Sequence, residues 1–244
     1  MESRAVRIWE LITDHATGDV ATVRDLCAAC VKAAGVDGAA LWVATDLDRR
    51  VLLHATDQVA RSLDEAGFTL GEGPGVQAWA ERGMVLAADL GSPEDAARWP
   101  MFTPAAVATG VGAIFAFPLQ VGAIRVGMLS LHRARPGPLS GEQLADALAF
   151  AFAAVTLVLD QAHPTPAGSG GSAGSAQPVW PIDGLGEGRA EVYQATGMVA
   201  VQLDARLDEA LLRLRAHAFA HGMGVTEVAL QVVTRQLRFS PEDP

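Results

Sequence analysis

The stretch AALWVATDLDRRVLLHA, residues 39–55, decides the fold of the first part of the chain. It contains two short apolar runs, 39–44 and 51–55, on either side of the turn-rich segment Asp46-Leu47-Asp48. Short apolar runs bounded by turn-forming residues are typical of strands in a sheet. We therefore expect two adjacent strands here, as part of an antiparallel sheet.

Helices and further strands are predicted on both sides of this pair. Apolar residues recur at helical spacing over 4–14 and 20–34, and the glycine-rich turn 71–75 leads into a helix through Ala78 and Arg82. A loop containing Asp89 and Trp99 is expected between a short strand and the next helix. Together these elements predict an α+β domain whose helices lie on one face of the sheet. The remaining predicted elements are strands at 84–87, 112–118 and 123–132, a helix near 103–109, and a closing helix over 144–161 whose capping box is Ser140 with Gln143.

A domain boundary is visible at residues 164–175, PTPAGSGGSAGS, which have the composition of a flexible linker. We divide the chain into a first domain over 1–162, a linker over 163–186 and a second domain over 187–239. The second domain has three apolar stripes at helical spacing and a glycine, Gly222, where a left-handed helix cap belongs. It is therefore predicted to be an all-α domain of three helices. Gly197 lies inside the first helix, where glycine lowers helix stability, so we expect another helix or an RNA to approach closely there.

The distribution of charge limits how this protein could bind nucleic acid. The net charge of the 244 residues is −10, and residues 1–162 hold 12 basic and 19 acidic side chains. Residues 187–239 hold 6 of each, so any nucleic-acid contact there must come from a local patch. The start of the chain lacks the apolar segment of a signal peptide, and the longest apolar run, 147–159, is shorter than a membrane span. We therefore expect a cytoplasmic protein without a membrane partner.

Motifs that could carry chemistry are few. Cys27 and Cys30 form a CxxC within a helical pattern, where buried core positions are favoured over a redox or metal role. The glycines of 71–75 lack the spacing of a phosphate-binding loop and favour a tight turn before a helix. The histidines do not suggest a metal site, and no arrangement of nucleophile, base or paired carboxylates is evident. Enzyme activity is therefore not expected, and the sequence identifies no cofactor.

Several short motifs of the first domain resemble those of the GAF sensory family. They are Gly71-Glu72-Gly73-Pro74, Asp89-Leu90, Trp99-Pro100, residues 117–122 (FPLQVG) and residues 126–129 (VGML), and the resemblance covers roughly 5–160. It implies a small-molecule sensor, although aromatic residues along strands are more often simple core. The ligand pocket is predicted to be lined by Trp42, Phe68, Trp79, Phe115 and Phe117.

The second domain resembles the ANTAR family of RNA-binding antitermination modules. The similar residues are Ala195 and Gly197 in the first helix, Glu209-Ala210 at the start of the second, and an arginine that follows them. Two positions depart from the family pattern: Thr196 stands where a lysine is frequent, and Arg206 stands where a serine or threonine would cap the second helix. The RNA-binding residues that this resemblance implies are Arg189, Gln194, Thr196, Gly197, Arg213, Arg215 and Arg235.

The two resemblances together predict a regulator of transcription antitermination. A signal at the GAF-like domain would shift the population of an RNA-competent form, within a homodimer, and the RNA partner would be a leader transcript with hairpins. Two alternatives remain open from the sequence. One is a ligand-binding or scaffolding protein whose C-terminal helices only dimerise, and the other is a DNA-binding regulator.

Overall fold

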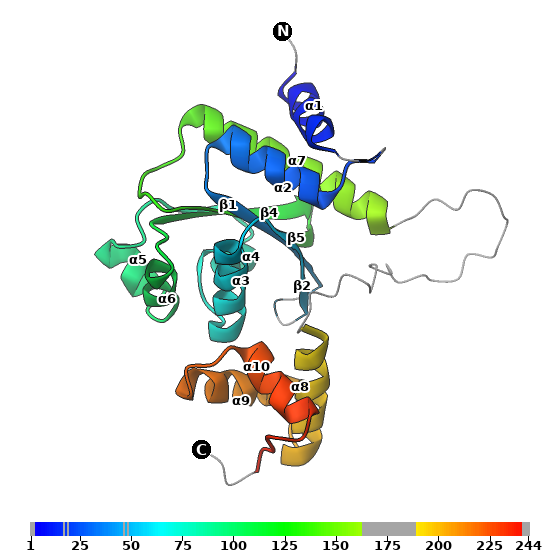
Figure 1. The fold of residues 1–244 in the computed structure, drawn as a ribbon, viewed down its shortest axis with the longest axis vertical. Helices are drawn as coiled ribbons and strands as arrows, with labels where there is room; N and C mark the ends of the chain where they lie inside the picture. Colours follow the sequence, from blue (N-terminus) through cyan, green and yellow to red (C-terminus); the bar gives the residue numbers. More distant parts are fainter. Residues whose placement is uncertain are drawn as a thin grey trace, which may run out of the picture.

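A computed structural model describes residues 3–240, except residues 17, 19, 46, 48 and 163–188. The predicted linker, 163–186, lies outside the described residues. The chain before it forms an α+β unit, called here the sensor unit after the sensory family that its motifs resemble, and the chain from Arg189 onward forms a three-helix unit (Figure 1).

The sheet of the sensor unit has five antiparallel strands in the order β2-β1-β5-β4-β3. The strand pair predicted from residues 39–55 is β1 and β2, with Trp42 opposite Leu52 and a bulge between Leu41 and Trp42. The bounds of the strands are β1 Gly38–Ala44, β2 Arg50–Ala55, β3 Val85–Ala87, β4 Ala113–Val121 and β5 Ile124–Arg133.

Helices cover both faces of this sheet, which corrects the expectation that they lie on one face (Figure 1). The physical reason is that β1 and the first part of β4 are continuously buried rather than alternating, so each face needs an apolar cover. One face is covered by α1 (Arg4–His15), α2 (Val23–Ala34) and α7 (Gly141–Ala162), and the other by α3 (Gln58–Leu70), α4 (Pro74–Glu81), α5 (Pro93–Arg98) and α6 (Phe102–Ala108).

Two of these helices were not predicted from the sequence. Helix α3 lies where no element was assigned, although Asp57 caps it by accepting a hydrogen bond from Ala60 N–H. Helix α5 occupies the middle of the segment expected to be a loop. Both are short or contain residues with low helix propensity, such as Gly67 and Thr69 in α3, so packing rather than propensity supports them.

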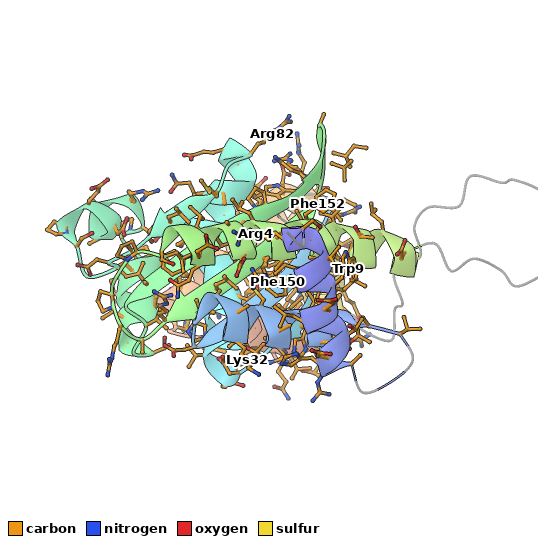
Figure 2. All side chains as sticks on the ribbon, turned by 90° about the horizontal axis from the view of Figure 1, so that it is seen from above. Arg4, Trp9, Lys32, Arg82, Phe150 and Phe152 are labelled. Carbon is orange, nitrogen blue, oxygen red and sulfur yellow. The ribbon has the colours of Figure 1, made fainter. Side chains whose placement is uncertain are left out.

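Helix α7 is a core helix with one exposed side. By length and composition its residues Gly141–Asp160 could also cross a membrane, which the shorter apolar run in the sequence did not indicate, but half of them are buried inside the molecule. Phe150 is fully buried against the sheet, whereas Phe152 is 72% exposed; both are labelled in Figure 2, which looks onto the layer of α1, α2 and α7. The buried side of α7 packs against α2 and β4.

The three predicted C-terminal helices are α8 (Arg189–Leu203), α9 (Leu207–Ala220) and α10 (Val225–Val233). Gly222 has φ +64°, so it adopts the left-handed conformation expected of it. A Cβ atom added at Gly197 would meet no atom of the described residues within 4 Å, so the expected close approach does not come from this part of the chain. The apolar core of the three helices also takes in Phe68 from α3 of the sensor unit.

The close spacing of β1 and β5 yields a stability prediction for Gly127→Ala. An added Cβ at Gly127 would lie 2.1 Å from the carbonyl oxygen of Trp42, so the strands would have to move apart. We expect a loss of about 1–3 kcal/mol in the free energy of unfolding, measured by denaturant titration. Gly141→Ala is the matched control, because a Cβ added there would meet no atom of the described residues within 4 Å. Equal stability of the two variants would contradict the strand spacing described here.

Candidate functional site

A small cavity of about 40 Å³ lies in the sensor unit between the sheet and helices α3, α4 and α6. Most of its lining is apolar, and the side chains of Trp42 and Phe102 narrow it. Four ionisable residues, Arg50, Asp64, Glu72 and His132, also line it. An apolar cavity with a few convergent polar groups is the usual composition of a small-molecule site.

Arg50 and Asp64 form a buried ion pair at this cavity. Their side chains are 3% and 4% exposed, and Arg50 Nη2 lies 3.5 Å from Asp64 Oδ1 and donates to the Asp64 carbonyl at 2.8 Å. The guanidinium also lies over the rings of Trp42, at 5.1 Å, and Phe68, at 5.2 Å. Because both side chains are buried, removing either one would leave the charge of the other buried without its ion-pair partner.

His132 and Asp57 form a second polar pair at the edge of the cavity. His132 Nε2 lies 3.2 Å from Asp57 Oδ2, and Gly38 makes room for the pair, because a Cβ there would lie 1.9 Å from that oxygen. Burial acts to raise the pKa of the Asp57 carboxyl, but the Ala60 N–H and His132 outweigh it and leave the pKa below its usual value. The other ring nitrogen of His132, Nδ1, is buried and has no hydrogen-bond partner among the described residues.

The glycine-rich turn beside the cavity has the conformation expected of a tight turn before a helix. Gly71 ends α3 at φ +67°, and Pro74 begins α4. Glu72 Oε1 accepts hydrogen bonds from the N–H groups of Met101 and Phe102, at the start of α6. Gly73 has φ +121°, and a Cβ there would lie 2.9 Å from the Phe102 ring. The turn therefore joins α3, α4 and α6 around one wall of the cavity.

The aromatic residues predicted to line one pocket lie in three different places. Trp42 lines the cavity, and Trp79 packs against Trp42, with the centroids of the two rings 5.4 Å apart. Phe115 and Phe117 lie on the opposite face of the sheet, in the core beneath α1, α2 and α7, so the structure does not bring them to this cavity. Phe68 turns away from the sheet and joins the core of the three-helix unit. Phe115 and Phe117 are two residues apart on β4 and therefore share a face of the sheet, but composition alone does not say which face it is.

The predicted RNA-binding residues of α8 differ in exposure. Gln194 is exposed and Gly197 is half-buried. Thr196 is buried, and its hydroxyl donates to the Val192 carbonyl at 2.7 Å within the same helix. Arg189 is the first residue of α8, and its side chain lies outside the described part of the chain.

The predicted arginines of α9 and α10 also have distinct surroundings. Arg213 is half-buried, and Arg235 is exposed just beyond α10 at φ +62°. Arg215 points to the sensor unit: its Nε donates to the Phe68 carbonyl at 3.0 Å, and its guanidinium lies 5.1 Å from the centre of the Phe68 ring. Two residues predicted for separate sites, Phe68 for the ligand pocket and Arg215 for RNA, are therefore in direct contact.

Polar residues of α3 that were not singled out in the sequence complete this contact. Thr69 Oγ1 accepts a hydrogen bond from Val225 N–H, and Glu65 Oε1 accepts one from the Thr226 hydroxyl. Their positions in an unassigned helix gave no signal of a role. The available signal was Asp57, a favourable N-cap residue before a periodic apolar pattern, which would have revealed α3 itself.

Cys27 and Cys30 are buried in α2, which confirms the core placement indicated by the sequence. Burial raises the pKa of the Cys27 thiol to about 12 and raises that of Cys30 well above its usual value. Among the described residues, no group of three or more His, Cys, Asp or Glu side chains could hold a metal ion.

No protein-family model and no curated protein matches the sequence. Among solved structures, the chain is similar to GAF domains. A GAF domain from an Acinetobacter phosphoenolpyruvate-protein phosphotransferase is 14% identical, with a TM-score of 0.49 over 66% of this chain and 93% of that one. The corresponding Coxiella burnetii domain is 13% identical, with a TM-score of 0.45 over 64% and 93%. A GAF domain/HD domain protein from Geobacter sulfurreducens is 17% identical, with a TM-score of 0.44 over 59% and 97%.

The burial of both thiols predicts that they do not react in the folded protein. Native protein mixed with a thiol-detecting disulfide reagent near neutral pH should give no signal, because the reactive thiolate is suppressed and inaccessible. The same protein in denaturant should show both thiols of the chain. Stoichiometric reaction of the native protein would contradict the described packing of α2.

The Asp57–His132 pair predicts a pH-dependent effect of Asp57→Asn. Because the folded-state pKa of Asp57 is lowered, its charge contributes stability above the unfolded value of about 3.9, and this contribution is lost as the pH falls through the folded value. Asparagine remains a good helix cap, so the variant isolates the charge. We expect it to unfold more easily at pH 7 and to approach wild type below about pH 4. Asp160→Asn, at an exposed site, is the control, and parallel pH profiles for Asp57→Asn and wild type would refute this account.

Proposed function

We propose that this chain is a signal-responsive, RNA-binding regulator of transcription antitermination. In this proposal the sensor unit is a GAF-like domain that binds a small molecule, and the three-helix unit is an ANTAR-like output that binds hairpins in nascent RNA. The chain works in the cytoplasm as a homodimer and without enzymatic activity.

The observation that carries this proposal is that one helix, α3, belongs to both parts. Its residues Ala60, Leu63, Asp64 and Gly67 line the cavity, and its last turns contact α9 and α10. Figure 1 shows α3 between the sheet and the three-helix unit. In this proposal a change in the cavity reaches the output through the displacement of α3.

The size of the cavity supports a sensing role that involves movement. Small-molecule pockets typically measure about 300–1,000 Å³, much larger than the cavity here. A ligand of ordinary size must therefore displace Phe102 or the turn at Gly73, which touch each other, and this turn follows directly after α3. The proposed ligand binds to the polar groups of Arg50, Asp64 and His132, and its binding favours the form of the protein with the larger cavity.

The RNA-binding part of the proposal is supported by the ANTAR resemblance and by a small set of accessible groups. Gln194 and Arg235 are exposed, and Arg213 and Gly197 are half-buried. Among the described residues, no atom would lie within 4 Å of a Cβ added at Gly197, which leaves room there for the close approach of a partner molecule. The neutral charge of this unit fits recognition by a few directed contacts to loop bases and phosphates.

The proposal predicts salt-dependent RNA binding that Arg213 strengthens. The probe is a synthetic RNA of two short stem-loops joined by a single-stranded spacer, titrated with the full chain at several salt concentrations. Arg213→Ala should weaken binding roughly tenfold and make the slope of log affinity against log salt shallower by about 0.7–0.9, the loss of one phosphate contact. Arg135→Ala, an exposed arginine of the sensor unit, removes the same charge and should leave binding close to wild type.

Three outcomes would overturn this assignment. Equal effects of Arg213→Ala and Arg135→Ala would mean that the affinity reflects overall charge rather than a site on α9. No salt-dependent binding by any form of the chain would favour the alternative in which the C-terminal helices only dimerise. Tighter binding to a DNA duplex than to the stem-loop RNA would favour the DNA-binding alternative.

A further inference from the structure

We propose that the docked arrangement of the three-helix unit on α3 is a closed form that excludes RNA, held by contacts that cap the C-terminal end of α3 and the N-terminal end of α10. The exclusion of RNA by this form rests on the proposed RNA-binding function. The docked arrangement itself rests on contacts that α8, α9 and α10 make with α3 and with the start of β2.

The first of these contacts completes the carbonyl end of α3. The last turn of an α-helix has carbonyl groups without partners inside the helix, and a cation there interacts favourably with the helix dipole. Phe68 lies in this last turn, and its carbonyl accepts the hydrogen bond from Arg215 Nε. Arg215 of the output unit is therefore the cap of a sensor helix.

The second contact completes the amide end of α10. The N-cap position of α10 is Gly224, which has no side chain to accept a hydrogen bond from the first turn. The acceptors come instead from α3: Thr69 Oγ1 lies 3.2 Å from Val225 N, and Glu65 Oε1 lies 3.4 Å from Thr226 N. The carboxylate of Glu65 also suits the positive end of the α10 dipole.

Apolar packing and one further hydrogen bond add to these caps. The Phe68 ring is 1% exposed and belongs to the core of the three-helix unit, which has few core residues of its own. Tyr193 of α8 donates its hydroxyl to the Arg50 carbonyl at 3.0 Å, at the start of β2. Each of the helices α8, α9 and α10 thus makes a directed hydrogen bond to the sensor unit.

Docking and RNA binding compete for Arg215. Its guanidinium stacks on Phe68 and its Nε is engaged by a carbonyl, so Nε and the ring-facing side of the guanidinium become available to a phosphate or a loop base only after the contact breaks. A phosphate would offer a charged acceptor and therefore a stronger hydrogen bond than the carbonyl. RNA binding consequently favours the undocked form, and docking weakens RNA binding by the same factor.

The docked contact is also incomplete, which suits a reversible interface. A cleft of about 920 Å³ separates the remaining surfaces of α3 and α6 from those of α9 and α10. It is bordered by Leu70 and Met101 on the sensor side and by Phe219 and Met223 on the other side. The units are therefore joined at the helix ends and not along a broad, closely packed face.

The test of docking measures hydrogen exchange at two backbone amides, Val225 and Thr226, in the full chain by NMR. These amides occupy the first turn of α10, where no acceptor exists within the helix, so their protection depends on α3. Glu65→Ala and Thr69→Val should each accelerate their exchange at least tenfold, while amides in the middle of α10 remain protected. Glu10 is an exposed glutamate on α1, so Glu10→Ala removes the same charge as Glu65→Ala and should leave the exchange rates of both amides unchanged. Fast exchange of both amides in the wild-type chain would overturn the docked form.

The test of RNA exclusion uses the same chains with the two-stem-loop RNA. Glu65→Ala and Thr69→Val, which leave every proposed RNA contact intact, should bind it about 5-fold to 150-fold more tightly than wild type or Glu10→Ala. If exchange shows undocking but affinity equals that of wild type, the exclusion of RNA is refuted while the RNA-binding function stands. If no chain binds RNA, undocked variants included, the proposed function fails and the exclusion fails with it, whereas the exchange data still decide whether the units dock.

Discussion

The end of helix α3 is the constraint on which the arrangement of this molecule depends. Its final carbonyls cannot be satisfied within the helix, and its next residue, Gly71, turns the chain sharply toward the cavity wall. Arg215 completes this end from outside, while the turn beyond it positions α4 and α6 through Glu72 and Gly73. The same helix end therefore fixes both the wall of the cavity and the position of the three-helix unit.

Arginine has a structural role throughout this acidic chain. Arg50 lies between the rings of Trp42 and Phe68, and Arg215 lies against Phe68 as well. Arg125 covers Trp79 in a similar way and donates to its carbonyl at 2.7 Å. A guanidinium can stack on a ring and donate in its own plane at once, which an ammonium group cannot do. Replacing such arginines with lysine would preserve the charge but lose the packing.

Most helices and strands could be predicted from the sequence, but not which of them pack against one another. The strands around Trp42, the capped α7 and the three C-terminal helices follow from apolar periodicity and turn residues, which are local signals. Helix α3 was missed because Gly67 and Thr69 weaken its helical pattern, and with it the contacts of Glu65 were missed. The opposite orientations of Phe68 and Phe115 depend on packing between distant segments, which composition and spacing do not encode. Buried pairs such as Arg50 with Asp64 join residues whose proximity only the fold establishes.

The packing of Phe68 in the core of the C-terminal helices has a consequence for folding during synthesis on the ribosome. Residue 68 emerges long before residue 225, and at about 5–20 residues per second the interval is roughly 8–30 s. During this time the aromatic ring and the uncapped end of α3 are exposed on a nascent sensor unit. The last helices then assemble on a surface that is already folded, so the N-terminal unit serves as a template for the C-terminal one.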